Sequence, residues 1–102
     1  MKSLFKPITI NKLELPNRIA MAPMTRMMSP EGIPGENVKE YYQRRAVGEV
    51  GLIITEGVEV SHPSSSGYPN VPGFQDKADE GWKNIIEACL LYTSDAADET
   101  GR

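Results

Sequence analysis

The sequence predicts an α/β fold in which parallel strands alternate with helices. Residues 19–22 and 52–55 are compact apolar runs of the kind that form strands buried inside a parallel sheet. Between them, apolar residues recur at helical spacing, so the order is strand, helix, strand. Such a unit closes with a right-handed crossover that leaves its two strands parallel. A second helical pattern follows, and this succession is how a (β/α)₈ barrel or a doubly wound sheet begins.

A short hairpin is expected before the first parallel strand. Two apolar pairs flank Asn11-Lys12, and asparagine readily adopts the left-handed conformation that a tight turn needs. The pairs are Ile8 and Ile10 before the turn, and Leu13 and Leu15 after it. The Pro16-Asn17 step then ends the hairpin.

The first helix is expected to begin at Asn37, because asparagine is a good N-cap and Glu40 follows three residues later. One face of this helix is formed by residues at helical spacing, which are Val38, Tyr41, Tyr42, Arg45 and Ala46. Gly48 is a suitable left-handed residue to end this helix.

The segment from Gly57 to Gln75 is rich in proline, serine and glycine, and it is expected to be a loop. Loops of this length are usually functional. A second helix is expected to start near Asp76 and Asp79. Its apolar residues, again at helical spacing, are Trp82, Ile85, Ile86 and Cys89.

Composition narrows the class of protein. The chain has 102 residues, a formal charge of −3 and a pI near 5.1, so it has no basic surface field for nucleic acid or anionic lipid, and small molecules are the expected ligands. It shows no signal peptide and no apolar run long enough to cross a membrane, which predicts a cytoplasmic protein. Cys89 is the only cysteine and His62 the only histidine, so neither an internal disulfide nor a structural zinc site is expected.

The last residues have a different character from the rest. Residues 89–102 resemble the in-frame translation of a transposon-end adapter used in preparing sequencing libraries. The alternative is an ordinary frayed polar terminus. We therefore expect residues 1–88 to be the native part of the chain and residues 89–102 to be a non-native tail.

Candidate ligand-binding residues follow the two parallel strands, because the carboxyl ends of such strands meet at one open edge. These segments are Pro23-Met24-Thr25-Arg26 and Glu56-Gly57. Thr25 offers a hydroxyl, Arg26 a planar cation, and Gly57 a backbone that a flat ring can approach closely. Together they could hold a planar ligand with a polar edge.

Each of these residues also has a purely structural interpretation. Thr25 could cap a strand end, Arg26 could pair with a surface charge, and Glu56 could be a solvated charge. The methionines Met21, Met24, Met27 and Met28 could form a pliable wall for a ligand, but packing in the core is the default. His62 is expected to be exposed and without a role, although a loop over an active site could recruit it.

Several ordered motifs resemble the opening of the old yellow enzyme family of FMN-dependent ene-reductases. They are Leu4-Phe5-Lys6-Pro7-Ile8, Pro16-Asn17-Arg18-Ile19, Ala22-Pro23-Met24-Thr25-Arg26, Tyr41-Tyr42-Gln43-Arg44-Arg45-Ala46, Ile53-Ile54-Thr55-Glu56-Gly57, Gly67-Tyr68-Pro69-Asn70, Pro72-Gly73 and Trp82-Lys83. The resemblance runs from Leu4 to about Ala88. It identifies the chain as an N-terminal fragment of a (β/α)₈ TIM barrel, comprising a hairpin and the first two β/α units.

The resemblance also implies a cofactor and a reaction. FMN would lie at the barrel mouth, with Pro23, Met24 and Thr25 beside the flavin ring and the Thr25 hydroxyl bonded near its C4 oxygen and N5. The main chain of Gly57 would meet the flavin. NAD(P)H would reduce FMN, and hydride would then pass to an α,β-unsaturated alkene. The family's substrate-binding His pair and proton-donating tyrosine have no match here, so the fragment alone is expected to be inactive.

Two other interpretations remain open. One is a longer iron–sulfur flavoprotein relative of the dienoyl-thioester reductase or amine dehydrogenase type, which a downstream run of cysteines would indicate. The other is a small α/β interaction module whose loop over residues 57–75 binds a protein partner. The substrate, the choice between NADH and NADPH, and the oligomeric state are not specified by this stretch of sequence.

Overall fold

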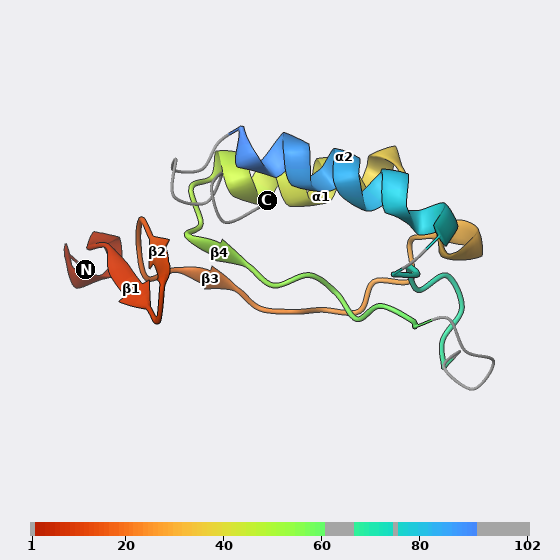
Figure 1. The fold of residues 1–102 in the computed structure, drawn as a ribbon, viewed down its shortest axis with the longest axis horizontal. Coiled ribbons are helices and arrows are strands. Elements are labelled where there is room, and N and C mark those ends of the chain that lie inside the picture. Colours follow the sequence, from red (N-terminus) through yellow and green to blue (C-terminus); the bar gives the residue numbers. More distant parts are fainter. Residues whose placement is uncertain (1, 61–66, 75, 92–102) are drawn as a thin grey trace.

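The computed structural model describes residues 2–60, 67–74 and 76–91. These residues form a hairpin, a two-stranded parallel sheet and two helices that lie side by side along the sheet (Figure 1). The 3₁₀ turns are η1 (Lys2–Phe5), η2 (Pro30–Gly32) and η4 (Asp76–Ala78). The strands are β1 (Ile8–Ile10), β2 (Leu13–Leu15), β3 (Ala20–Met21) and β4 (Leu52–Ile53), and the helices are α1 (Glu36–Val47) and α2 (Asp79–Leu90).

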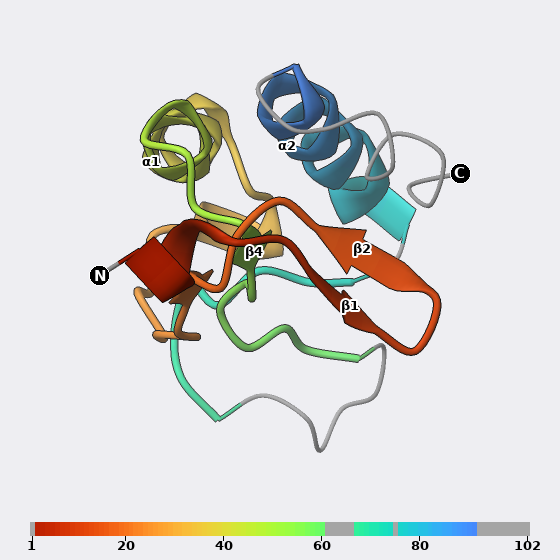
Figure 2. The same cartoon turned by 90° about the vertical axis from the view of Figure 1, so that its left-hand side faces the viewer.

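The hairpin forms as predicted. β1 and β2 pair antiparallel, with Ile8 opposite Leu15 and Ile10 opposite Leu13. Asn11 takes the left-handed conformation at the turn, with φ of 55°. The hairpin lies at the N-terminal end of the parallel sheet (Figure 2), and within it the side chain of Leu15 is buried.

The predicted strand, helix, strand unit is also present. β3 and β4 pair in parallel, with Ala20 opposite Leu52 and Met21 opposite Ile53, and α1 connects them. Asn17 closes the start of the sheet: its Nδ2 donates to the carbonyl of Glu49 at 2.8 Å, and its Oδ1 accepts from the amide of Ile19 at 3.0 Å. The Asn17 side chain therefore links the segments that lead into β3 and β4.

Both parallel strands are shorter and less buried than predicted. The apolar runs over residues 19–22 and 52–55 contribute only two residues each to the ladder. Leu52 and Ile53 are half-buried, and Ile54 is 45% exposed. In the described part of the chain the helices cover one face of the sheet (Figure 1), so the expectation of burial on both faces is wrong for this chain.

The core lies between the helices and the parallel strands. It consists of Met21 from β3, Val38 and Tyr42 from α1, and Ile85 from α2. Partly buried apolar residues complete it, namely Tyr41, Ile53, Trp82 and Cys89. The helical spacing predicted for the two faces is thus confirmed, except at Ile86, which is 48% exposed.

The ends of α1 differ from the prediction. The N-cap is Gly35, while the Asn37 side chain donates to the carbonyl of Met28 at 3.1 Å and caps nothing. Gly48 has φ of −76°, because its amide still makes a helical bond to Arg44 at 3.0 Å. The left-handed residue is Glu49, with φ of 69°.

The described parts of the loop over residues 57–75 fold back against neighbouring segments. The amide of Glu59 donates to Pro72, that of Gly73 to Gly32, and that of Ser29 to Asn70, all at 2.8–2.9 Å. The indole of Trp82 in α2 donates to the Gly73 carbonyl at 2.7 Å. This loop is therefore tied down by main-chain bonds at both ends; His62 lies outside the described residues.

Replacement of Gly81 by alanine is expected to destabilise the chain. A Cβ at position 81 would collide with the carbonyl oxygen of Pro34 and lie 3.0 Å from its Cγ. Overpacking against backbone costs about 1–3 kcal/mol, which exceeds the roughly 1 kcal/mol that alanine gains in a helix. Urea unfolding of the 102-residue chain, followed by circular dichroism, measures the change.

The matched control is Gly67→Ala, since a Cβ at that position meets nothing within 4 Å. The control should leave the free energy of unfolding unchanged or slightly raise it. Equal stability of the two variants would show that α2 does not pack against Pro34 in this way.

Candidate functional site

The segments that follow β3 and β4 lie side by side, as the sequence predicts. A Cβ built on Gly57 would stand 3.9 Å from the Thr25 Oγ1 atom, so the hydroxyl of one segment faces the bare backbone of the other. Pro23, Met24, Thr25 and Gly57 are all exposed. The structure thus brings Thr25 and Gly57 together on an accessible edge, and Pro23 and Met24 precede Thr25 in the same exposed segment.

This edge has the properties that a flat ligand with polar groups requires. Pro23 and the half-exposed Met24 give an apolar border, and the Thr25 hydroxyl can donate or accept a hydrogen bond. Because Gly57 has no side chain, a ring can approach its main chain beside Thr25. The residues present therefore fit a ring such as a flavin.

Glu56, next to Gly57, is buried and not solvated. Its side chain is completely inaccessible, and its Oε2 accepts a hydrogen bond from the Tyr42 hydroxyl at 2.8 Å. The same hydroxyl accepts from the Glu56 amide, also at 2.8 Å. Burial raises the pKa of the Tyr42 hydroxyl well above its ordinary value, so Tyr42 remains protonated and able to donate.

Arg26, next to Thr25, also points inward. Its Nη1 lies 4.0 Å from the Glu56 Oε2 atom, and its side chain is 18% exposed. The guanidinium carbon stands 3.5 Å from the ring centre of Tyr41, a cation–π contact. The interpretation of Arg26 as a surface ion-pair partner is therefore wrong: it pairs with a buried carboxylate.

The charged pair is incompletely satisfied. Among the described residues, neither Arg26 Nη1 nor Glu56 Oε1 has a hydrogen-bond partner, although both atoms are buried. A second cation, Arg45, stands 3.9 Å from the Tyr41 ring centre. Arg26 and Glu56 therefore attract each other by charge without a direct hydrogen bond, whereas Glu56 is hydrogen-bonded to Tyr42, and Arg45 Nη1 donates to the Tyr41 carbonyl at 3.1 Å.

Sequence reasoning missed the Glu56–Tyr42 contact. For the Arg26–Glu56 pair the available signal was two opposite charges within five residues of the ends of two neighbouring parallel strands. The prediction for the methionines was correct in one case: Met21 is in the core, whereas Met24, Met27 and Met28 are 42–50% exposed. Three of the four methionines are thus free to line a ligand.

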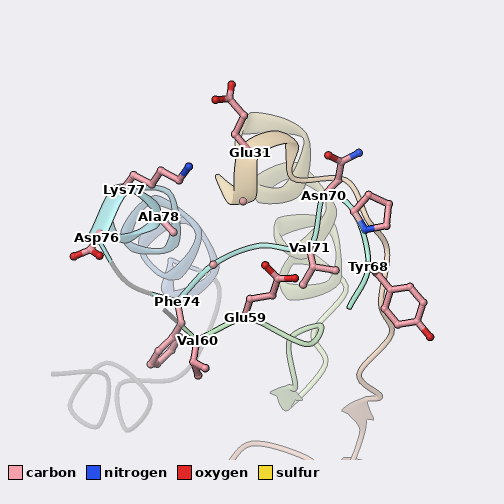
Figure 3. Close-up of a pocket in the computed structure, with 13 residues that line it drawn as sticks. Glu31, Glu59, Val60, Tyr68, Asn70, Val71, Phe74, Asp76, Lys77 and Ala78 are labelled. Carbon is pink, nitrogen blue, oxygen red and sulfur yellow. The ribbon is translucent and has the colours of Figure 1, made fainter. Parts of the chain in front are cut away.

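A hollow of about 590 Å³ lies among the loops beyond β4. Figure 3 shows Glu59 between Tyr68 and Asn70 on one side and Asp76 and Lys77 on the other. The Glu59 Oε2 atom is buried and has no hydrogen-bond partner among the described residues. A functional role for this loop stays a prediction.

The described residues contain neither a metal-binding cluster nor a membrane-spanning helix. No three His, Cys, Asp or Glu side chains there are grouped so that they could hold a metal ion. No helix in the described part of the chain has the length and apolar character needed to span a membrane.

Comparisons with known proteins give a consistent result. Residues 3–97 match the NADH:flavin oxidoreductase / NADH oxidase family. The chain is 38% identical over 86 residues to 12-oxophytodienoate reductase 7 of Oryza sativa subsp. japonica, which covers 83% of this chain and 21% of that protein. The family match includes residues 89–97, and the adapter origin of residues 89–102 stays a prediction.

Solved structures match equally well. Morphinone reductase in complex with tetrahydroNAD superposes with a TM-score of 0.79 at 40% identity, over 88% of this chain and 24% of that one. Old Yellow Enzyme from Pichia sp. AKU4542 superposes with a TM-score of 0.78 at 35% identity, over 90% of this chain and 24% of that one.

The chain therefore spans about a quarter of the length of these relatives, whose folds are TIM barrels. Its hairpin and its parallel strand, helix, strand unit are a partial α/β structure of that barrel. By this match and by the ordered motifs along it, the chain belongs to the NADH:flavin oxidoreductase / NADH oxidase family, which includes the old yellow enzymes.

Proposed function

We propose that this chain supplies the flavin-contacting edge of an FMN-dependent oxidoreductase that transfers hydride from NAD(P)H to activated, α,β-unsaturated alkenes. The observation that carries the proposal is the juxtaposition of the Thr25 hydroxyl with the bare main chain of Gly57, where two parallel strands end. Ligand sites of parallel α/β folds lie at this end of the strands. Membership of the flavin oxidoreductase family supplies the ligand class.

Four residues of this chain would hold the cofactor. Pro23 and Met24 would border the ring, the Thr25 hydroxyl would bond its polar edge, and the main chain of Gly57 would lie against it. FMN, when bound, supplies the hydride chemistry, while the protein supplies orientation and the hydrogen bonds that tune its reduction potential. The hydroxyl of Thr25 is the tuning group within this chain.

The names of the relatives support the substrate class. One relative is a reductase named for 12-oxophytodienoate and another for morphinone, and a solved structure of the latter contains tetrahydroNAD. These names support a small organic substrate and a nicotinamide hydride donor. We place the substrate-binding and proton-donating residues outside this chain, because its described residues contribute two parallel strands where a barrel has eight.

The isolated 102-residue chain is expected to hold no flavin. Its candidate site residues are exposed, and among the described residues the parallel sheet beside them has two strands, which are too few to enclose a ligand. Titration of the purified chain with FMN, followed by flavin fluorescence and visible absorbance, should show the spectrum of free FMN throughout. A yellow chain that oxidises NADPH would contradict this expectation.

Thr25→Val in the complete enzyme, expressed from its source DNA, is expected to lower the flavin reduction potential. Valine keeps the shape but removes the hydrogen bond, which is worth about 1–3 kcal/mol to an electron-rich acceptor. For a two-electron couple this equals about 20–60 mV. Redox titration against a dye of known potential measures the shift.

Thr25→Ser is the matched control, because it retains the hydroxyl and should keep the potential close to that of the unsubstituted enzyme. If valine and serine leave the potential equally unchanged, Thr25 does not contact the flavin. A complete protein that binds no FMN at all would overturn the proposed function itself.

A further inference from the structure

The two site segments continue beyond the end of the β-ladder. The amide of Ile54 donates to the Met21 carbonyl at 3.2 Å, and among the described residues this is the last main-chain bond between the segments that lead to Thr25 and Gly57. Yet Thr25 and Gly57, several residues further on, still face each other. Side chains must therefore hold the segments together at the site.

Arg26 and Glu56 are placed to do this. Each directly adjoins one site residue, Arg26 following Thr25 and Glu56 preceding Gly57. Their charged groups approach to 4.0 Å between Nη1 and Oε2 in a region where the Glu56 side chain has no exposure. Charges shielded from water attract one another far more strongly than exposed charges do.

Each member of the pair is also seated on α1 through one of two adjacent tyrosines. Glu56 exchanges two hydrogen bonds of 2.8 Å with the Tyr42 hydroxyl, through its carboxylate and its amide. Arg26 stacks on Tyr41 at 3.5 Å. The two tyrosine rings meet edge to face, with centres 5.1 Å apart. Helix α1 thus contacts the segments after β3 and β4 through two tyrosines that pack against each other.

We propose that Arg26 and Glu56 are a positioning pair that sets the placement of the Thr25 hydroxyl relative to Gly57, and so sets how strongly that hydroxyl stabilises the reduced flavin. This inference rests on the proposed function. Neither residue is placed to touch the ligand; each acts through its neighbour in sequence. A buried ion pair is poor evidence of stability, since apolar replacements are often as stable, so the contribution expected of this pair is geometric.

The test uses the complete FMN-loaded enzyme with Arg26→Met, Glu56→Gln and the double variant. Glu56→Gln keeps one oxygen as an acceptor for Tyr42 and removes the charge, with an amide NH2 in place of the second oxygen. The readouts are the reduction potential, the visible flavin spectrum, the FMN dissociation constant and the urea midpoint. Each single variant should shift the oxidised-to-reduced equilibrium at least tenfold toward the oxidised form, which is about 30 mV for two electrons.

The double variant separates positioning from stability. It leaves no unpaired buried charge, so its urea midpoint should return close to that of the unsubstituted enzyme, while the tenfold shift and the altered spectrum should persist. Arg26→Lys keeps the positive charge, so its flavin reduction potential should lie close to that of the unsubstituted enzyme. If single variants fail to fold, the double variant decides alone.

The matched control is Lys39→Met, which breaks the 3.0 Å Glu36–Lys39 pair on the exposed side of α1 and should change neither potential nor spectrum. An unchanged potential and spectrum in the double variant would overturn the positioning role, whatever the urea midpoints show. An unsubstituted enzyme without FMN would instead overturn the proposed function, so the two failures are distinguishable.

Discussion

The arrangement of the site depends on one buried carboxylate. Removing Glu56 from water is costly unless its oxygens find donors and an opposite charge. The Tyr42 hydroxyl donates to one of the two oxygens, Oε2, and accepts from the Glu56 amide, while Arg26 brings the opposite charge from the other strand end. Glu56 therefore connects β4, α1 and the segment after β3, and it leaves its neighbour Gly57 facing Thr25 at the surface.

The fold was largely predictable because its signals are local. The apolar runs around Met21 and Ile53, and the helical spacing between them, were enough to predict two parallel strands joined by a helix. Helix ends were predicted less well, because tertiary contacts decide them. Asn37 has the character of an N-cap in the sequence, but its side chain donates to the carbonyl of Met28, nine residues earlier in the chain. The chain accordingly starts α1 from Gly35 without a side-chain cap.

The site was predictable in part for a physical reason. Parallel strands deliver the residues that follow them to one edge, so the proximity of Thr25 and Gly57 follows from the order of the elements. The burial of Glu56 does not follow from that order. It depends on how α1 docks on the sheet and on which way Tyr42 points, and neither is encoded in the spacing of apolar residues. The alternative interpretation of Glu56 as a solvated charge at a strand end is therefore wrong.

Amide hydrogen exchange at Glu56 in the Tyr42→Phe variant tests most directly whether Tyr42 anchors the end of the strand. Phenylalanine preserves the packing of the core but removes the hydroxyl that accepts the Glu56 amide and donates to its carboxylate. Losing a bond of about 1–2 kcal/mol should speed exchange of that amide roughly 5- to 30-fold, while exchange of the Ile54 amide, bonded to Met21, stays the same. An unchanged rate at Glu56 would contradict the claim that Tyr42 anchors the strand end.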